Sequence, residues 1–390
     1  MQQGRGREPD SVALRSLGMV VGALEGALSK PCFPGVPMRN VLRLCSIGLA
    51  VVACCGSASA TIPFTTFVSG TDLNTVLGNQ ATIGFAYAGD KFVGSVYFGT
   101  NNNQLYSTNL SGGAVQKFGA PIAGFTGEVY VTASLGIGGF GPRDVYAGSE
   151  AQGTIYRIAH DGSSQSLFVS GLVGGVRSIA FDPYGAYGHQ MIVATNAGYI
   201  YKVDNTGAAT LLAQVGEDAE GLSFAPQAFG TYGAGTLFVA SENSGTLRAI
   251  GPGGAVSVAV AGIGGAEMVS FVPLNLGASG SPVEGFYAAA YPANVQKADA
   301  SQFLPYLGDA IVTSETSHQI WQIHYDSATS AFDVNQIGTF PAQPEDGIFV
   351  TTDLIRSAIP EPTGLALMLA GLGLVGGVRR RSTGRKNAQA

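Results

Sequence analysis

The chain has 390 residues, of which only 12% are charged, and its 26 acidic and 20 basic side chains give a formal net charge of −6 at pH 7. Between residues 61 and 357 the imbalance is larger: nine Lys or Arg stand against twenty-two Asp or Glu, a net charge of −13. An acidic region of this size argues against nucleic acid and anionic lipid as partners, because both would repel it.

Residues 38–60 have the layout of a secretory signal peptide. Arg39 and Arg43 precede the apolar run 44–55, and the small residues Ala58 and Ala60 mark a cleavage position. The sequence therefore predicts export.

Residues 1–37 precede this signal without clear periodicity. We interpret them as the product of a misassigned start codon, with an extended leader as the alternative. A competing interpretation of Val51–Cys54 is a lipoprotein box in which Cys54 is acylated.

All four cysteines lie before the predicted cleavage position, at Cys32, Cys45, Cys54 and Cys55. The processed chain would contain none, although an oxidising compartment permits disulfides. Thiol chemistry and cysteine metal sites are thus excluded from the body, and its stability must come from a packed core.

Residues 61–357 are predicted to form one all-β domain, since their number fits a single large core. The whole chain contains 57 glycines, and here short β-branched or aromatic runs alternate with Gly, Asn and Asp turns. Such runs are typical of strands and hairpins.

An internal repeat runs through this domain. Three segments share the pattern strand, glycine turn, strand: 144–158, 190–203 and 236–250. Their turn glycines, Gly153, Gly198 and Gly245, are spaced 45 and 47 residues apart and are expected at positive φ. Each segment is followed by a polar turn, another strand and a closing apolar element, at 176–182, 220–225 and 267–272. Weaker copies lie at 94–108 and 309–324, and 284–297 is a candidate for a diverged strand pair.

A period near 45 residues with about four short strands per unit is typical of a β-propeller blade. Dividing roughly 295 residues by a period of about 46 gives about 6.4 units. We therefore expect six blades, with seven as the alternative.

The closing element "SIAFDP" at 178–183 and the following strands of the form "IVATN-G-IYKVD-TG" at 192–207 carry a resemblance to a known group. They are similar to NHL-repeat and gluconolactonase-type six-bladed propellers, and the resemblance covers residues 140–275. For the gluconolactonase-like group it implies a divalent metal in the central channel, bound through Glu, Asn and Asp. The resemblance is specific for architecture and weak for activity.

Two sets of side chains recur at equivalent blade positions. The first set ends a strand and consists of Glu150, Asn196, Glu242 and Glu315; the second opens a strand and consists of Glu220, Glu267 and Glu345. If equivalent positions converge on the propeller axis, either set could form a partial ring that holds Ca²⁺ or another divalent cation through oxygen ligands. The alternative is that these side chains cap turns and face solvent at one rim.

The last segment, 358–390, has three parts. Pro360, Glu361 and Pro362 are followed by the uncharged apolar run 363–378 and then by Arg379, Arg380 and Arg381. This tail resembles the PEP-CTERM sorting signal of bacterial exported proteins. The resemblance implies a single hydrophobic helix that holds the protein in the inner membrane until an exosortase processes the tail. The apolar run has sixteen residues, fewer than the roughly 20 that a membrane helix needs, which fits a transient anchor.

These patterns together predict an exported propeller of the cell envelope or extracellular matrix. We expect a non-enzymatic binding or structural module, with extracellular polysaccharide or an envelope protein as its partner and with no nucleic acid. The alternative is a metal-dependent hydrolase or lyase of the gluconolactonase-like type.

Overall fold

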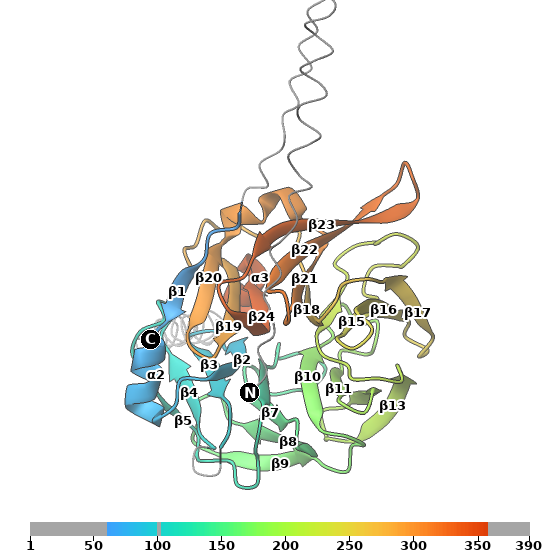
Figure 1. Cartoon of the computed structure of the whole chain (residues 1–390). Helices are drawn as coiled ribbons and strands as arrows, with labels where there is room; N and C mark the ends of the chain where they lie inside the picture. The colour runs from blue at the N-terminus through green and yellow to red at the C-terminus, as the bar shows by residue number, and fades with distance from the viewer. Residues whose placement is uncertain (1–60, 100–102, 358–390) are drawn as a thin grey trace, which may run out of the picture. The chain divides into compact units, whose positions relative to one another are not determined.

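The computed structural model of the chain describes residues 61–99 and 103–357, and these residues form six antiparallel sheets of four strands each (Figure 1). Each sheet is one blade of a β-propeller. The signal peptide, the residues ahead of it and the C-terminal sorting segment lie outside the described residues.

The first four blades follow the chain in order. Blade 1 contains β2 (Thr82–Tyr87), β3 (Phe92–Val96), β4 (Leu105–Thr108) and β5 (Gln116–Phe118). Blade 2 contains β6 (Val129–Ala133), β7 (Val145–Ser149), β8 (Gln152–Ile158) and β9 (Gln165–Val169). Blade 3 contains β10 (Val176–Phe181), β11 (Met191–Thr195), β12 (Tyr199–Val203) and β13 (Ala209–Gln214). Blade 4 contains β14 (Leu222–Phe224), β15 (Leu237–Ser241), β16 (Thr246–Ile250) and β17 (Val256–Val260).

Blades 5 and 6 are interleaved. Blade 5 begins with β18 (Ala266–Phe271) and is completed by β21 (Ala310–Ser314), β22 (Gln319–Asp326) and β23 (Ala331–Thr339). The intervening hairpin, β19 (Gly285–Tyr291) and β20 (Val295–Asp299), belongs to blade 6 together with β24 (Gln343–Val350) and the N-terminal β1 (Thr65–Val68). Strands from both ends of the described region therefore meet in one sheet, which closes the propeller.

The prediction of six blades is confirmed by the contacts around the axis. The innermost strands are β2, β6, β10, β14, β18 and β24, and each of them contacts the innermost strands of both neighbouring blades. The predicted repeat segments form the hairpins β7–β8, β11–β12 and β15–β16, and the predicted pair at 284–297 forms β19–β20. The closing elements differ from expectation in one respect: each is the innermost strand of the next blade, so the sequence repeat is offset from the blade by one strand.

Burial is greatest in the second strand of a blade and falls toward the outer edge. Strands β7, β11, β15 and β21, second from the axis, are buried along their whole length, whereas outer strands such as β13 and β17 are largely exposed. Packing between blades buries aromatic clusters, for example the stacked rings of Phe85 and Phe92 against Tyr287. These interfaces supply the apolar burial that a chain without disulfides needs.

The turn glycines are only partly as expected. Gly198 and Gly245 have φ of 77° and 61°, the left-handed region that favours glycine. Gly153 is required for a different reason, because a Cβ atom there would lie 2.1 Å from the carbonyl oxygen of Leu172.

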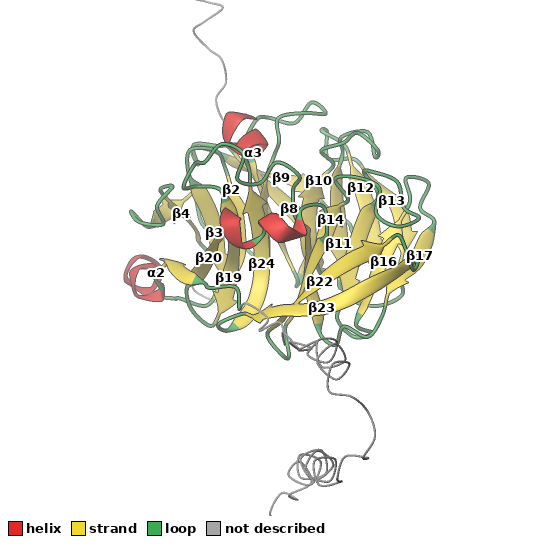
Figure 2. Ribbon diagram, turned by 90° about the horizontal axis from the view of Figure 1, so that it is seen from above, coloured by secondary structure: helices red, strands yellow, loops and turns green. Residues whose placement is uncertain are grey.

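Four short helical segments lie outside the sheets: α2 (Gly70–Leu77), α3 (Thr352–Ser357) and the 3₁₀ turns η2 (Ala300–Gln302) and η3 (Leu304–Tyr306). Figure 2 shows α2 beside the blades and α3 over one face of the propeller. Among the described residues, none of the helices is long and apolar enough to span a bilayer.

Candidate functional site

A β-bulge recurs near the beginning of the innermost strands. In blade 5, Glu267 and Met268 lie opposite the single residue Thr313, and in blade 6, Glu345 and Asp346 lie opposite Ala289. The register of β10 against β11 likewise leaves Arg177 as an extra residue. A bulge bends the strand and redirects the side chain at that position.

Side chains from these innermost segments, three of them at bulges, converge. Tyr130, Arg177, Glu220, Glu267 and Glu345 come from the innermost segments of five successive blades, and together they line a cavity of about 10 Å³. A cavity of that size accommodates about one water-sized particle. We call this part of the channel the carboxylate neck.

Arg177 is the organising cation on one side of the neck. Its guanidinium forms ion pairs with Glu128 and, at 3.0 Å, with Asp218, and Nη1 lies 3.3 Å from Glu150 Oε2. The Tyr130 hydroxyl donates to Glu128 Oε2 at 2.7 Å and accepts from Arg177 at 3.2 Å. The positive charge of Arg177 is therefore already shared among several carboxylates.

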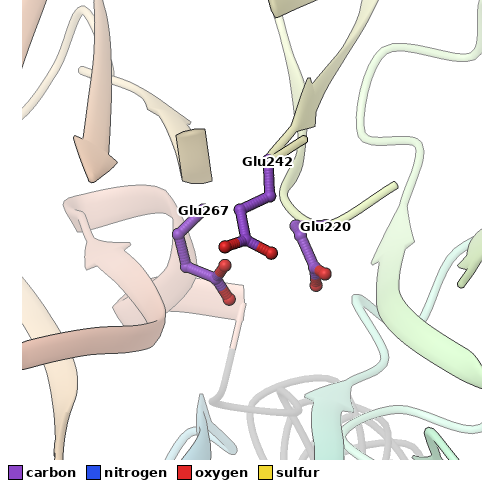
Figure 3. A group of neighbouring side chains, drawn as sticks. All are labelled: Glu220, Glu242 and Glu267. Atoms are coloured by element: carbon purple, nitrogen blue, oxygen red, sulfur yellow. The ribbon is translucent and has the colours of Figure 1, made fainter. Parts of the chain in front are cut away.

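Glu220, Glu242 and Glu267 form the other side of the neck, and Figure 3 shows their carboxylates pointing toward one another. One oxygen atom from each lies within 4.8 Å of the others. Glu220 is 2% exposed, and neither of its carboxylate oxygens has a hydrogen-bond partner; Arg177 Nε lies 3.1 Å from Oε1 without forming a hydrogen bond. A buried carboxylate without a donor is costly.

Gln343 and two further carboxylates adjoin this group. The Gln343 amide donates to Glu345 at 2.9 Å and also to Glu315. Glu315 in turn shares a hydrogen bond with Glu242. The neck thus contains many more acidic groups than Arg177 can neutralise.

Several carboxyl groups of the neck and its surroundings have raised pKa values. Burial, followed by the charge of Glu267, raises the pKa of Glu220 well above its ordinary value. Burial and the neighbouring carboxylates likewise raise the pKa of Glu267 and of Glu345. Burial and the hydrogen bond to Glu242 raise the pKa of Glu315 to about 7. The neck therefore binds either protons or another positive charge near neutral pH.

The two sequence-predicted sets lie at the same end of the propeller, and the structure brings together members of both. Glu242 and Glu315 from the first set join Glu220, Glu267 and Glu345 from the second. This meeting follows from antiparallel pairing, because the end of the second strand lies beside the start of the innermost one. The alternative of a solvent-facing rim does not describe Glu220, Glu267 and Glu345, which are 2%, 6% and 2% exposed.

The remaining two members of the first set lie apart from the three-glutamate group. Glu150 pairs with Arg177 and accepts from the backbone N–H of Glu128 at 2.9 Å. Asn196 is exposed, and its amide accepts from Gly175 N–H at 2.9 Å and donates to the Glu150 carbonyl oxygen at 3.0 Å. Both hold the turns between neighbouring blades.

Sequence reasoning missed Arg177, Tyr130 and Glu128. A signal for Arg177 was present, because 176–182 aligns with 220–225 and 267–272 and places Arg177 at the position of Glu220 and Glu267. Tyr130 precedes the region of strong repetition.

A second, larger cavity of about 250 Å³ lies farther along the axis. It is lined from all six innermost strands and from the loops that follow them, and it shares Ser178, Gly221, Met268 and Asp346 with the neck. Asp346 is partly exposed to the channel, but its burial away from bulk water raises its pKa to about 7. We call this space the axial cavity.

No family model and no curated protein matches the chain. Among solved structures, a chain of the nidogen–laminin complex is similar at 13% identity and a TM-score of 0.45, covering 69% of this chain and 84% of its own. A protein provisionally described as an oxidoreductase (glucose dehydrogenase) from Thermus thermophilus is similar at 14% identity and a TM-score of 0.48, covering 75% of this chain and 92% of its own. The function must therefore be argued from the residues of this chain.

Proposed function

We propose that this protein is an exported β-propeller of the cell envelope or extracellular matrix that acts as a binding module and holds one divalent cation, Ca²⁺, in the carboxylate neck. The observation that carries the cation site is the buried Glu220 carboxylate, which has no donor and faces Glu242 and Glu267 beside a cavity for one particle. The binding role and the export rest on the sequence.

Charge balance supports a cation. Carboxylates that are withdrawn from water must be protonated, paired or bound to metal. Arg177 forms ion pairs with Glu128, Asp218, Glu150 and Glu220, so this one cation cannot balance the charge of Glu220, Glu242 and Glu267 as well. One divalent ion would supply it.

The donor set favours Ca²⁺ over transition metals. The candidate ligands are carboxylate oxygens, which suit hard cations, and among the described residues no histidine belongs to the group. Oxygens on opposite sides of a bound Ca²⁺ lie about 5 Å apart, given bonds of about 2.3–2.6 Å. The 4.8 Å limit on the three glutamate oxygens is compatible with that spacing.

The positions of the histidines favour a binding role over a catalytic one. In the described part of the chain, no histidine lines either cavity. His160 contacts Asp90 at 2.9 Å and His324 contacts Asp309 at 2.9 Å. The most common general base is thus absent from both cavities, and glycan-array binding by the purified protein is the direct test for a polysaccharide partner.

A metal-dependent hydrolase or lyase is the second candidate, and one observation favours it. Asp346 lines both the neck and the axial cavity, and its pKa of about 7 suits a general acid or base at neutral pH. If it is catalytic, Asp346→Asn should abolish Ca²⁺-dependent lactone hydrolysis while leaving Ca²⁺ bound. A purified, calcium-loaded protein without hydrolysis of any lactone in a panel would remove this candidate.

Export and sorting are proposed from the two ends of the sequence. Cleavage after Ala60 and processing near Pro360–Pro362 by an exosortase would release the propeller from the inner membrane. Intact-mass analysis from an exosortase-containing host should give a chain that lacks Arg379–Arg381. A mass that includes those arginines would contradict processing.

The cation proposal is tested with the purified full chain. After dialysis against Ca²⁺, elemental analysis should find one Ca²⁺ per chain, and calorimetric titration of the chelator-treated protein should show one site. Glu220→Gln should weaken binding at least tenfold, because it removes the negative charge of a buried carboxylate whose oxygens accept no hydrogen bond. Glu217→Gln is the matched control, since Glu217 pairs with Arg248 and should leave binding unchanged. No bound Ca²⁺ at pH 7.5 would overturn the proposal.

A further inference from the structure

The axial cavity contains a second buried charge of opposite sign. Arg143, in the loop between β6 and β7, lines the cavity and is 4% exposed. Its Nε and Nη1 atoms are buried and have no hydrogen-bond partner. A guanidinium carries five N–H donors and stays charged in proteins, so unmade hydrogen bonds at a buried arginine call for an acceptor.

The described residues do not supply a carboxylate for it. Arg143 forms no ion pair with residues 61–99 or 103–357. Its polar contact is from Nη2 to the carbonyl oxygen of Leu354, and its guanidinium lies 5.7 Å from the centre of the Tyr87 ring. A carbonyl dipole and an aromatic face stabilise a cation only in part.

The backbone of Arg143 is also unusual. Its φ is 62°, in the left-handed region that residues with a Cβ atom rarely adopt. Such conformations persist where the surrounding structure holds them, and they concentrate at ligand sites. This backbone conformation would suit glycine, yet the position is occupied by an arginine whose charged side chain lines the cavity.

Helix α3 lies against the same place. Leu354 lines the cavity, and its carbonyl oxygen accepts from Arg143. The helix has six residues and stands over one face of the propeller (Figure 2). A ligand that reaches Arg143 must therefore enter beside α3 or displace it.

We propose that the axial cavity binds a small organic carboxylate, with Arg143 as the anchor for its negative charge. Apolar and polar groups contribute about equally to the surface of the wall; the apolar part includes Phe85, Leu222, Phe224, Phe271 and Phe349, and Thr132 and Ser270 are among the polar residues. The volume of about 250 Å³ is slightly below the usual range for ligand pockets, about 300–1,000 Å³. The ligand is therefore a compact acid with one apolar body.

The other end of the cavity favours a ligand that carries only one negative charge. Asp346 contributes a carboxyl group there. A phosphate dianion would bring two negative charges into a cavity that already contains this carboxyl group, whereas a monocarboxylate can direct its single charge to Arg143 and its body toward the aromatic wall. This inference does not depend on Ca²⁺ in the neck.

The test uses benzoate, its neutral counterpart benzamide and inorganic phosphate, each titrated into the full-length protein by calorimetry and by thermal unfolding. We expect saturable benzoate binding with a rise in Tm, and binding of benzamide and phosphate at least tenfold weaker. Equal binding of benzoate and benzamide, or no binding of benzoate, would overturn the proposal without any variant. If phosphate binds best, the carboxylate assignment is wrong.

Arg143→Gln supplies the second arm. The variant keeps a polar side chain with N–H donors and the same backbone constraint but removes the charge, so benzoate affinity should fall at least tenfold. Without ligand, its Tm should be equal to or above that of the parent protein, because a buried unpaired charge is gone. Arg248→Gln is the matched control, since Arg248 pairs with Glu217 outside the axial cavity, and it should bind benzoate normally. Undiminished benzoate binding by Arg143→Gln would assign the arginine to holding α3 only.

Discussion

The two ends of the propeller axis place charge in the interior in opposite ways. The carboxylate neck collects acidic groups from several blades around one arginine, whereas the axial cavity holds a single arginine with no carboxylate paired to it. At the first end there are more carboxylates than Arg177 can balance, and at the second Arg143 is unpaired although the carboxyl group of Asp346 lines the same cavity. Each end therefore lacks the partner that a ligand of opposite charge would provide.

The comparison also separates two ways of building a site. The neck depends on bulges in the innermost strands, each of which pairs with the second strand of its blade and packs between the innermost strands of the two neighbouring blades. The axial cavity depends on a loop residue and a short helix, Arg143 and α3. We expect the neck to be the more rigid site, because Glu267 lies on β18 and Glu220 and Glu242 lie next to the ends of β14 and β15, and the cavity to be the more adaptable one.

The largest expected effect comes from Arg177→Met in chelator at pH 7.5. Glu128 and Asp218 would lose their counter-ion while remaining partly buried, and breaking such a pair costs about 3–5 kcal/mol of unfolding free energy. Urea unfolding measures the change, and added Ca²⁺ should recover part of it.

Arg248→Met is the control for that variant. Arg248 has a similarly low exposure but pairs with Glu217 alone, so the loss should be about 1 kcal/mol and insensitive to Ca²⁺. Equal losses for the two variants would show that the neck is an ordinary ion-pair network.

The next effect is a pH dependence with an unusual sign. Glu315 and Asp346 have a pKa of about 7 in the folded protein, above the ordinary values near 4, so the folded state holds more protons than the unfolded chain between about pH 4 and pH 7. Stability should therefore fall as pH rises. In chelator we expect Tm to drop by roughly 5 °C from pH 5 to pH 8.

Calcium should offset part of this drop, because a cation in the neck balances the negative charge that Glu315, next to the ligand Glu242, gains when it loses its proton. Calorimetry at pH 5, 6, 7 and 8 with and without Ca²⁺ makes the measurement. A Tm in chelator that rises with pH would contradict both the raised pKa values and the surplus of carboxylates in the neck.

Leu354→Ala addresses the other end of the axis. Leu354 is partly buried on α3 and lines the axial cavity, so its truncation should cost about 1–2 kcal/mol. Calcium affinity should stay within about twofold of the parent value, because no neck ligand contacts this helix. A large loss of calcium binding would mean that the two ends are coupled.

The blades could be predicted from the sequence because the residues that define each hairpin lie close together in the chain. Hairpins such as β11–β12 carry their own turn glycine, Gly198, and the period repeats them. The sequence did not predict that the β19–β20 hairpin, which lies in the chain between two strands of blade 5, belongs to blade 6. This arrangement depends on which distant strands pair. Helix α2 was also missed: eight residues are too few for a clear period, although Ser69 accepts a hydrogen bond from the N–H of Thr71 and Gly78 ends the helix in the left-handed conformation.

For the site, the sequence predicted the residue type and the end of the propeller but not the grouping. Glu242 and Glu220 were assigned to separate sets because they lie on different strands. Their convergence required the antiparallel pairing of those strands and the bulges, which the local pattern does not encode. Arg143 had no sequence signal, because its importance lies in its burial without a partner.

Tyr130→Phe is the smallest of the predicted effects and locates the cation within the neck. The hydroxyl donates to Glu128 and accepts from Arg177, so its loss should cost about 1 kcal/mol of stability. Because Arg177 already donates to the Tyr130 hydroxyl oxygen, this oxygen is not available as a cation ligand. The Ca²⁺ affinity of the variant should therefore stay within about threefold of the parent value, a change of less than about 1 kcal/mol in binding free energy. A tenfold loss would instead place the ion on the Tyr130 side of the neck, in competition with Arg177. Titration of Ca²⁺ into the variant and the parent protein decides between the glutamate group and Arg177 as the neighbours of the ion.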